Sequence, residues 1–197
     1  MMDPSVVAHL TPGLIGADAC LWLAGLAATV PRGEAIVEVG VFQARTTCYL
    51  GAGAKAGYGA HVWGIDPWEF PGNPRRRGYV KSLMTRPATR ISAERLVTKS
   101  GLDDQVTLVH GFSVDVGQAW DGPPVGLLFI DGDHRAEMVR RDWEAWRPHL
   151  TADAIIIFDD YGARWPGVVE VVDELVEAGV IVAPAVLYAK MALTRLP

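Results

Sequence analysis

Short, continuous hydrophobic runs alternate along the chain with longer amphipathic stretches. The runs Val125–Ile130 and Ala154–Phe158 contain no polar side chain, which is typical of strands buried on both faces of a parallel sheet. The pattern predicts strands at Ala35–Val39, His61–Ile65, Val106–Val109, Val125–Ile130 and Ala154–Phe158, with two more inside Val180–Leu193. It predicts helices at Leu14–Thr29, Ala44–Ala56, Ser92–Ser100, Arg135–Arg147 and Gly167–Glu177.

This alternation predicts an α/β fold: a doubly wound, mostly parallel seven-stranded sheet with helices on both faces. A chain of 197 residues fits one domain. Residues 1–33 form a helical extension outside the sheet pattern. This apolar extension packs either on its own domain or on a second subunit, so the sequence is compatible with both a monomer and a homodimer.

Composition narrows the class of protein. Half of the residues are hydrophobic and 21% are charged, which excludes a disordered chain. A net charge of -5 gives no basic coat for nucleic acid, and the apolar stretch Ala19–Val30 is too short to span a bilayer. No Lys or Arg precedes Arg32, so we expect no targeting segment and a cytoplasmic location without membrane or nucleic-acid partners. Cys20 and Cys48 are expected to be reduced interior thiols.

Acidic residues recur where the predicted strands end. Glu38 lies in the first strand, Asp66 follows the second, Asp131 follows Val125–Ile130, and Asp159 and Asp160 follow Ala154–Phe158. In open parallel sheets, ligands bind outside the carboxyl ends of the strands. The sequence therefore predicts that these acids form a site instead of a solvated rim.

The turn after the first strand lacks a dinucleotide fingerprint. Between Glu38 and Thr47 the only glycine is Gly40, whereas a pyrophosphate loop needs three glycines. Asp66, 26 residues after Gly40, is placed to accept hydrogen bonds from ribose hydroxyls. A ribose acceptor without a pyrophosphate loop indicates a nucleoside that lacks pyrophosphate, and S-adenosylmethionine fits that description.

Asp131, Asp159 and Asp160 predict a hard divalent cation. Three carboxylates at one edge repel each other, and Mg²⁺ prefers carboxylate oxygens. The acid pair begins 28 residues after Asp131, enough for one crossover helix. In the alternative interpretation, Asp159 or Asp160 caps the next turn and Asp131 contacts only the cofactor's amino group. His134, three residues after Asp131, is then a structural histidine.

The chain resembles the class I S-adenosylmethionine-dependent methyltransferases. The resemblance is carried by the turn Glu38–Thr47, by Asp66, and by the strand ends Phe129–His134 and Phe158–Tyr161. It implies a Rossmann-like methyltransferase fold in which Glu38 and Gly40 face the methionine moiety and Asp66 binds the ribose. It also implies contacts from Asp131 to the cofactor and from the turn Gly111, Phe112 and Ser113 to the adenine. Ser113 is also interpreted as a helix N-cap. Ala44 departs from the pattern, because the family often has a second glycine there.

Among these enzymes, the chain looks most like metal-dependent O-methyltransferases that act on sugars of macrolides and of mycobacterial polysaccharides. That resemblance implies Mg²⁺ or Mn²⁺ on Asp131, Asp159 and Asp160, with His134 as the general base. The acceptor is then a hydroxyl of a small molecule or oligosaccharide. Catechol and polyketide O-methyltransferases are the alternative. Catechol-type relatives commonly use a lysine as base, and no Lys lies between Ser100 and Lys190.

Two further segments are candidates for acceptor binding. Residues 67–90 hold four prolines and the run Arg75, Arg76 and Arg77, and predict either a lid over a polar substrate or a solvated basic turn. Tyr161 and Trp165 lie in predicted site loops, where aromatic rings stack on sugars or anchor the loops by packing.

Two other classes of function compete with this interpretation. A nicotinamide-dependent dehydrogenase is disfavoured because the glycine fingerprint and a Tyr-x-x-x-Lys pair are missing. A non-catalytic nucleoside-binding protein is disfavoured because an acid trio has no purpose in nucleoside binding alone.

Overall fold

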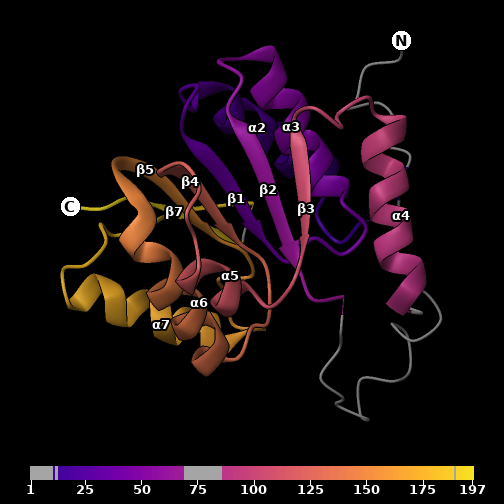
Figure 1. The fold of residues 1–197 in the computed structure, drawn as a ribbon. Helices are drawn as coiled ribbons and strands as arrows, with labels where there is room; N and C mark the ends of the chain where they lie inside the picture. Colours follow the sequence, from indigo (N-terminus) through magenta and orange to yellow (C-terminus); the bar gives the residue numbers. More distant parts are fainter. Residues whose placement is uncertain (1–10, 12, 69–85, 189) are drawn as a thin grey trace.

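A computed structural model describes residue 11 and residues 13–68, 86–188 and 190–197. The elements in chain order are α2 (Ala17–Thr29), β1 (Ala35–Val39), α3 (Arg45–Ala56), β2 (His61–Asp66), α4 (Arg86–Lys99), β3 (Val106–His110), α5 (Ser113–Gln118), β4 (Val125–Ile130), α6 (Ala136–Trp146), η2 (Arg147–His149), β5 (Leu150–Phe158), α7 (Pro166–Glu177), β6 (Ala185–Leu187) and β7 (Met191–Thr194). Figure 1 shows how they surround one central sheet.

The sheet has seven strands in the order β3-β2-β1-β4-β5-β7-β6. Strands β1 to β5 pair in parallel, whereas β7 runs antiparallel to both of its neighbours. The predicted doubly wound, mostly parallel fold is therefore confirmed. Because β1, β2, β4 and β5 point the same way, the residues that follow them meet at one edge of the sheet. The strand order reverses between β1 and β4, which is where open α/β sheets bind ligands.

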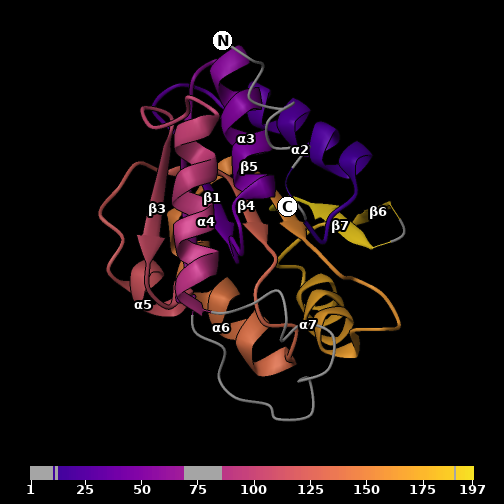
Figure 2. The ribbon, with the colours of Figure 1, turned by 90° about the vertical axis from the view of Figure 1, so that its right-hand side faces the viewer.

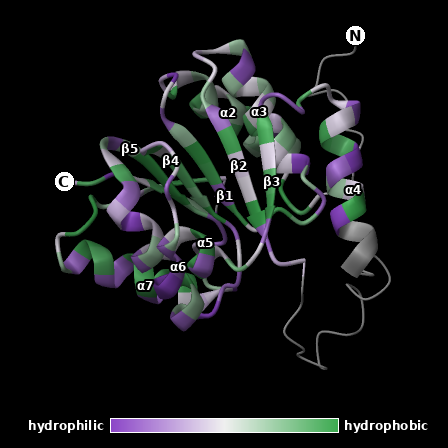
Figure 3. Cartoon of the chain, in the orientation of Figure 1, coloured by the Kyte–Doolittle hydropathy of each residue, from purple (hydrophilic) through white to green (hydrophobic). Residues whose placement is uncertain are grey.

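Helices cover both faces of the sheet (Figure 2), with α2, α3 and α4 on one side and α5, α6 and α7 on the other. Each central strand contributes to both layers of the core. In β4, Leu127 and Phe129 pack toward α2 and α3, while Leu128 and Ile130 pack toward α6 and α7. This two-sided burial explains why the strand sequences are continuously apolar, and Figure 3 shows the hydrophobic residues gathered along the sheet.

Helix α2 packs against α3 of its own domain. A Cβ on Gly53 would lie 2.0 Å from the carbonyl oxygen of Ala24, and one on Gly57 would lie 2.0 Å from that of Ala28. Small residues on α3 therefore allow the two helix backbones to touch. The described part of the N-terminal extension is joined to the domain by this contact. Two buried cysteines have free thiols, as predicted: Cys20 on α2 and Cys48 on α3.

The structure differs from the predicted elements in several places. Helix α4 begins at Arg86, inside the predicted lid, because Pro87 is tolerated in the first turn of a helix. Strand β5 begins at Leu150, four residues earlier than predicted, and its early residues are partly exposed. The six-residue helix α5 is not among the predicted helices, although the interpretation of Ser113 as an N-cap implies a helix at this place. Residues 69–85 of the predicted lid, which include Arg75, Arg76 and Arg77, lie outside the described residues. In the parts of the chain that the structure describes, no helix has the length and apolar character needed to cross a membrane.

Candidate active site

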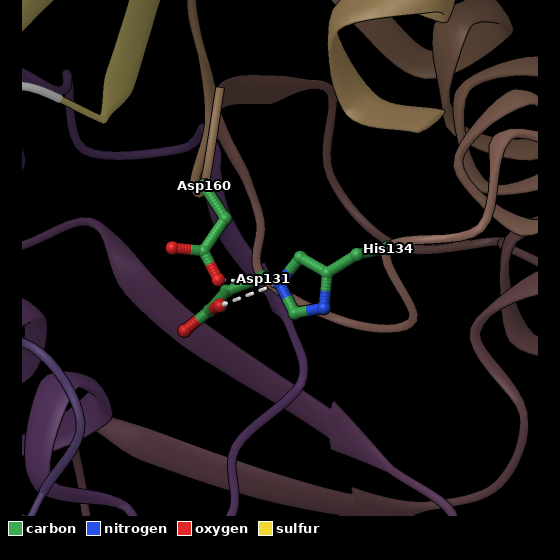
Figure 4. Close-up of side chains that lie close together, drawn as sticks. All are labelled: Asp131, His134 and Asp160. Carbon is green, nitrogen blue, oxygen red and sulfur yellow. Dashed lines mark ion pairs between the residues drawn. The ribbon is translucent and has the colours of Figure 1, made fainter. Parts of the chain in front are cut away.

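Asp131, His134 and Asp160 lie together beyond the ends of β4 and β5 (Figure 4). His134 Nε2 is 2.9 Å from Asp160 Oδ2 and 3.9 Å from Asp131 Oδ1. Each residue offers one ligand atom, and these atoms all lie within 4.8 Å of one another. The structure thus brings together three of the four residues predicted for the metal and the base.

The loop between β4 and α6 aims His134 at the acids. Asp133 accepts hydrogen bonds from the backbone N–H and the guanidinium of Arg135, which ties its carboxylate to the start of α6. Helix α6 begins at Ala136, so His134 lies in the loop before the helix. The backbone of His134 is also held from the other side, because a Cβ on Gly167 of α7 would lie 2.6 Å from the His134 carbonyl oxygen.

Asp159 is the fourth predicted residue, and it is bound to a lysine. Lys190 Nζ lies 2.6 Å from Asp159 Oδ2 and 3.1 Å from Asp160 Oδ1. The other oxygen of Asp159, Oδ1, is buried without a hydrogen-bond partner. Asp159 therefore faces the cation of Lys190, whereas Asp160 is shared between Lys190 and His134.

The acids titrate unequally because their partners differ. Burial and the neighbouring Asp159 raise the pKa of Asp131 well above its ordinary value. Burial also raises the pKa of Asp159, against the hydrogen bond and charge of Lys190. Although burial acts in the same direction at Asp160, contacts with His134 and Lys190 outweigh it and lower the pKa of that carboxyl group. Asp131 and Asp159 therefore resist ionisation without a further positive charge nearby, which is the behaviour expected of carboxyl groups in a cation-binding site.

Aromatic rings pack beside the cluster. The imidazole of His134 stacks on the indole of Trp165, with ring centroids 4.5 Å apart and planes 23° apart, and Arg164 lies over the same indole. Tyr161 donates its hydroxyl hydrogen bond to Asp173 of α7, at 2.8 Å. Trp165 thus packs against the predicted base. The hydroxyl group of Tyr161 is hydrogen-bonded to another residue of this chain, Asp173.

The turn after β1 is shaped by its backbone. Gly40 has a φ of 92°, and a Cβ there would lie 2.2 Å from the carbonyl oxygen of Asp131. Gly40 is therefore needed for the close contact between the ends of β1 and β4, whether or not a ligand also approaches the Gly40 backbone. Phe42 and Ala44 also have positive φ angles, of 53° and 63°. Ala44 thus adopts a conformation that favours glycine, the residue that the family often has at that position.

Glu38 is buried under this turn. Its carboxyl group accepts a hydrogen bond from the Thr47 hydroxyl, and only 1% of the residue is exposed. Burial raises the pKa of Glu38 to about 8, even though the Thr47 hydrogen bond acts in the opposite direction. Glu38 is therefore mostly neutral at pH 7 in the free protein.

Asp66 bridges the same turn to the end of β2. Its Oδ2 accepts hydrogen bonds from the backbone N–H groups of Val41 and Phe42, both at 2.9 Å, and its Oδ1 accepts one from Trp68 at 2.5 Å. A carboxylate offers about four lone pairs, so about one, on Oδ1, remains for a further donor. The main contacts of Asp66 thus hold the turn after β1, and one acceptor position remains for a ribose hydroxyl.

The predicted adenine turn lies at the start of α5. Phe112 is the N-cap residue and Ser113 is the first residue of the helix, so the interpretation of Ser113 as an N-cap is wrong. Ser113 Oγ instead accepts a hydrogen bond from Trp146 Nε1 at 2.8 Å. Asp142 of α6 is buried and hydrogen-bonds Ser113. Burial raises the pKa of Asp142 to about 6, against that hydrogen bond. Phe112 is about half exposed, so it is available to a planar ligand.

Sequence reasoning missed Lys190, since its part in the cluster depends on strand pairing. The antiparallel register of β5 and β7 places Phe158 opposite Ala192, and Lys190, two residues before Ala192, contacts the acids in the turn after Phe158. A separate hollow of about 320 Å³ lies between α5 and α6, lined in part by Arg141 and His149. Its lining contains none of the predicted site residues.

The fold and this edge define a class of protein: doubly wound α/β enzymes that hold a ligand beyond the strand ends, beside a cluster of carboxylates and an imidazole. Residues 37–161, from β1 to just after β5, match the model of a family described as Methyltransferase domain. The chain belongs to this family.

Solved structures of other proteins share the fold. The O-methyltransferase TomG from Streptomyces achromogenes, in complex with SAM, is 16% identical, with a TM-score of 0.71 over 100% of this chain and 90% of TomG. An O-methyltransferase from Bacillus cereus in complex with SAH is 15% identical, with a TM-score of 0.69 over 98% of this chain and 87% of that one. The O-methyltransferase NovP is 19% identical, with a TM-score of 0.67 over 93% and 81%.

Proposed function

We propose that this protein is an S-adenosylmethionine-dependent O-methyltransferase that methylates a hydroxyl group of a small acceptor, a sugar or oligosaccharide. Membership of the methyltransferase family supports the reaction class. TomG and the Bacillus cereus enzyme are O-methyltransferases solved with SAM or SAH bound, which supports the cofactor and the acceptor atom. The observation that carries the proposal is His134 Nε2, 2.9 Å from Asp160 and at the acid edge of the sheet.

The cofactor is proposed to lie across the ends of β1, β2 and β4. Asp66 has about one lone pair left for a ribose hydroxyl, and the half-exposed ring of Phe112 can pack on adenine. Glu38 and Asp131 provide carboxyl groups on the side proposed for the methionine ammonium. Gly40 keeps this turn close to Asp131, and Gly111 and Ser113 complete the proposed adenine turn.

A divalent cation, Mg²⁺ or Mn²⁺, is proposed to be held by Asp131, Asp159 and Asp160. The residues fit such an ion in two ways. They are hard oxygen donors gathered at one edge of the sheet, and the buried Oδ1 of Asp159 has no hydrogen-bond partner in the described structure. When bound, the ion would lower the pKa of the acceptor hydroxyl and orient its oxygen.

His134 is the proposed general base. Its Nε2 faces the acid cluster, where an acceptor hydroxyl beside Asp160 would present its proton. After proton transfer the imidazolium is stabilised by the Asp160 carboxylate, while the stack on Trp165 keeps the ring in place. Lys190 is a poorer base, because Asp159 and Asp160 raise its pKa above the ordinary value, against the opposite effect of burial.

The acceptor class is tested by direct assay of methyl transfer. The full chain is incubated with methyl-labelled S-adenosylmethionine and, separately, with sugar, catechol and polyketide acceptors. We expect labelled methyl ether on the sugar acceptor, abolished by EDTA and restored by Mg²⁺ or Mn²⁺. Transfer only to a catechol or polyketide would contradict the sugar acceptor and support the alternative acceptor class. Full activity in EDTA would contradict a role for the metal in the reaction.

A further inference from the structure

Lys190 lies where a cation would bridge the two neighbouring aspartates. Its Nζ contacts Asp159 Oδ2 at 2.6 Å and Asp160 Oδ1 at 3.1 Å. Asp159 is only 2% exposed, whereas 31% of the Lys190 side chain is exposed. Among the ion pairs of the described residues, Lys190 is the only Lys or Arg partner of this acid pair. The ammonium thus neutralises part of the charge that a metal would neutralise.

The position of Lys190 is built into the fold. The pairing of β5 with β7 ends with Phe158 opposite Ala192, so Lys190 lies just before β7, beside the acids that follow β5. The Lys190 carbonyl oxygen accepts a hydrogen bond from the Tyr161 N–H group at 2.7 Å, which fixes the backbone next to the acids. The four-carbon side chain above this anchor is flexible, so Nζ is able to leave while the backbone stays.

We propose that Lys190 is a tethered counter-cation that competes with the divalent ion for Asp159 and Asp160, and that metal binding displaces its ammonium toward solvent. This inference rests on the proposed function, because it requires the ion to use Asp159. With Lys190 Nζ on Asp159 Oδ2, a divalent ion on the free Oδ1 and on Asp160 would lie within a few ångströms of the ammonium, and two cations so close repel strongly in a partly buried site. In the metal-free protein Lys190 keeps the buried carboxylate of Asp159 paired, which protects the fold from an uncompensated charge.

The test measures Mn²⁺ binding by calorimetry in the full-length wild-type protein, in Lys190→Met and in Lys55→Met. Lys55 is the matched control because its Nζ binds only a backbone carbonyl oxygen, that of Gly101 at 3.0 Å, in the described structure. Removing the competing charge is expected to tighten Mn²⁺ binding at least about tenfold in Lys190→Met, with no change in Lys55→Met. Equal or weaker binding in Lys190→Met overturns the proposal.

A second measurement on the wild-type protein is independent of whether Lys190→Met folds. Lysines are acetylated with a limiting amount of reagent, with and without Mn²⁺, and labelling at Lys190 is quantified by mass spectrometry against Lys55. Displacement predicts that Mn²⁺ increases labelling of Lys190 severalfold while Lys55 is unchanged. Labelling that Mn²⁺ leaves unchanged or reduces overturns displacement, even if Mn²⁺ binds.

Failure of the Lys190 competition and failure of the proposed metal site give different results. If wild type and Lys190→Met bind Mn²⁺ equally well, the metal site stands and the competition is wrong. If neither binds Mn²⁺ while both bind S-adenosylhomocysteine, the metal and the competition fall together and the methyltransferase assignment remains.

Discussion

The imidazole of His134 stacks face to face on the indole of Trp165, with centroids 4.5 Å apart. The pair joins the loop after β4 to the loop after β5, and so fixes the ring of the proposed base relative to the acids that follow both strands. Trp165 itself immediately precedes Pro166, the first residue of α7. The stack therefore connects the base to a rigid element.

Replacing Trp165 with alanine should reduce turnover without reducing cofactor affinity. An aromatic pair of this kind contributes about 0.5–1.5 kcal/mol, which corresponds to a fall of about 2- to 12-fold in kcat if the stack is lost in the transition state. Trp165→Phe should retain most of the activity, since it keeps a ring against His134. The measurement is kcat alongside the Kd for S-adenosylhomocysteine. A Trp165→Ala variant with wild-type kcat would show that the stack does not position the base.

Asp66→Ala should weaken both the fold and cofactor binding. The substitution leaves the N–H groups of Val41 and Phe42 without their acceptor, at a cost of about 1–3 kcal/mol in the free energy of unfolding. We expect the affinity for S-adenosylhomocysteine to fall by about 1.5–3 kcal/mol as well, through loss of the ribose contact.

Urea unfolding and calorimetry separate the two effects of Asp66→Ala. Asp103→Ala is the control, because Asp103 is exposed and accepts a side-chain hydrogen bond from Thr98. If Asp66→Ala loses stability but binds S-adenosylhomocysteine as tightly as wild type, Asp66 holds the turn and does not bind the ribose.

Glu38 should make the protein less stable as the pH rises. Its pKa is about 8 in the folded protein, against an ordinary value of 4.5, so the folded state binds a proton that the unfolded state releases. The resulting stability is fully present below about pH 4.5 and is lost as the pH approaches and passes 8, with a slope of at most about 1.4 kcal/mol per pH unit.

The variant Glu38→Gln isolates this contribution, because the amide is neutral at every pH and has nearly the same shape. Urea unfolding between pH 5 and pH 9, a range chosen to span roughly the folded-state pKa, is compared for the two proteins. The unfolding free energy of wild type should fall relative to that of Glu38→Gln as the pH rises. Parallel pH profiles would mean that Glu38 is ionised in the folded protein near neutrality.

The positions of site residues that directly follow continuous apolar strands could be predicted from the sequence. Asp131 and the pair Asp159–Asp160 were placed correctly at one edge because β4 and β5 are buried on both faces and parallel. Lys190 was not predicted, because its contact depends on the register of an antiparallel strand some 30 residues away in sequence. The loop-holding role of Asp66 was missed because its partners are backbone N–H groups, which carry no sequence signal.

The boundaries that were wrong have local causes. Helix α4 starts among residues whose prolines indicate a loop, yet a proline in the first turn removes no helical hydrogen bond. Helix α5 is too short to show a period of 3.6 residues, and Ser113, interpreted as its cap, is used by Trp146.

The proposed base, His134, is tested most directly by the rate of methyl transfer in His134→Ala, measured with saturating S-adenosylmethionine and the acceptor that wild type methylates best. We expect turnover to fall about 10²- to 10⁴-fold, the usual contribution of a general base, while the Kd for S-adenosylhomocysteine and for Mn²⁺ stays close to that of wild type. Near-wild-type turnover would contradict the role of His134 as the base, and loss of Mn²⁺ binding would make His134 a metal ligand instead.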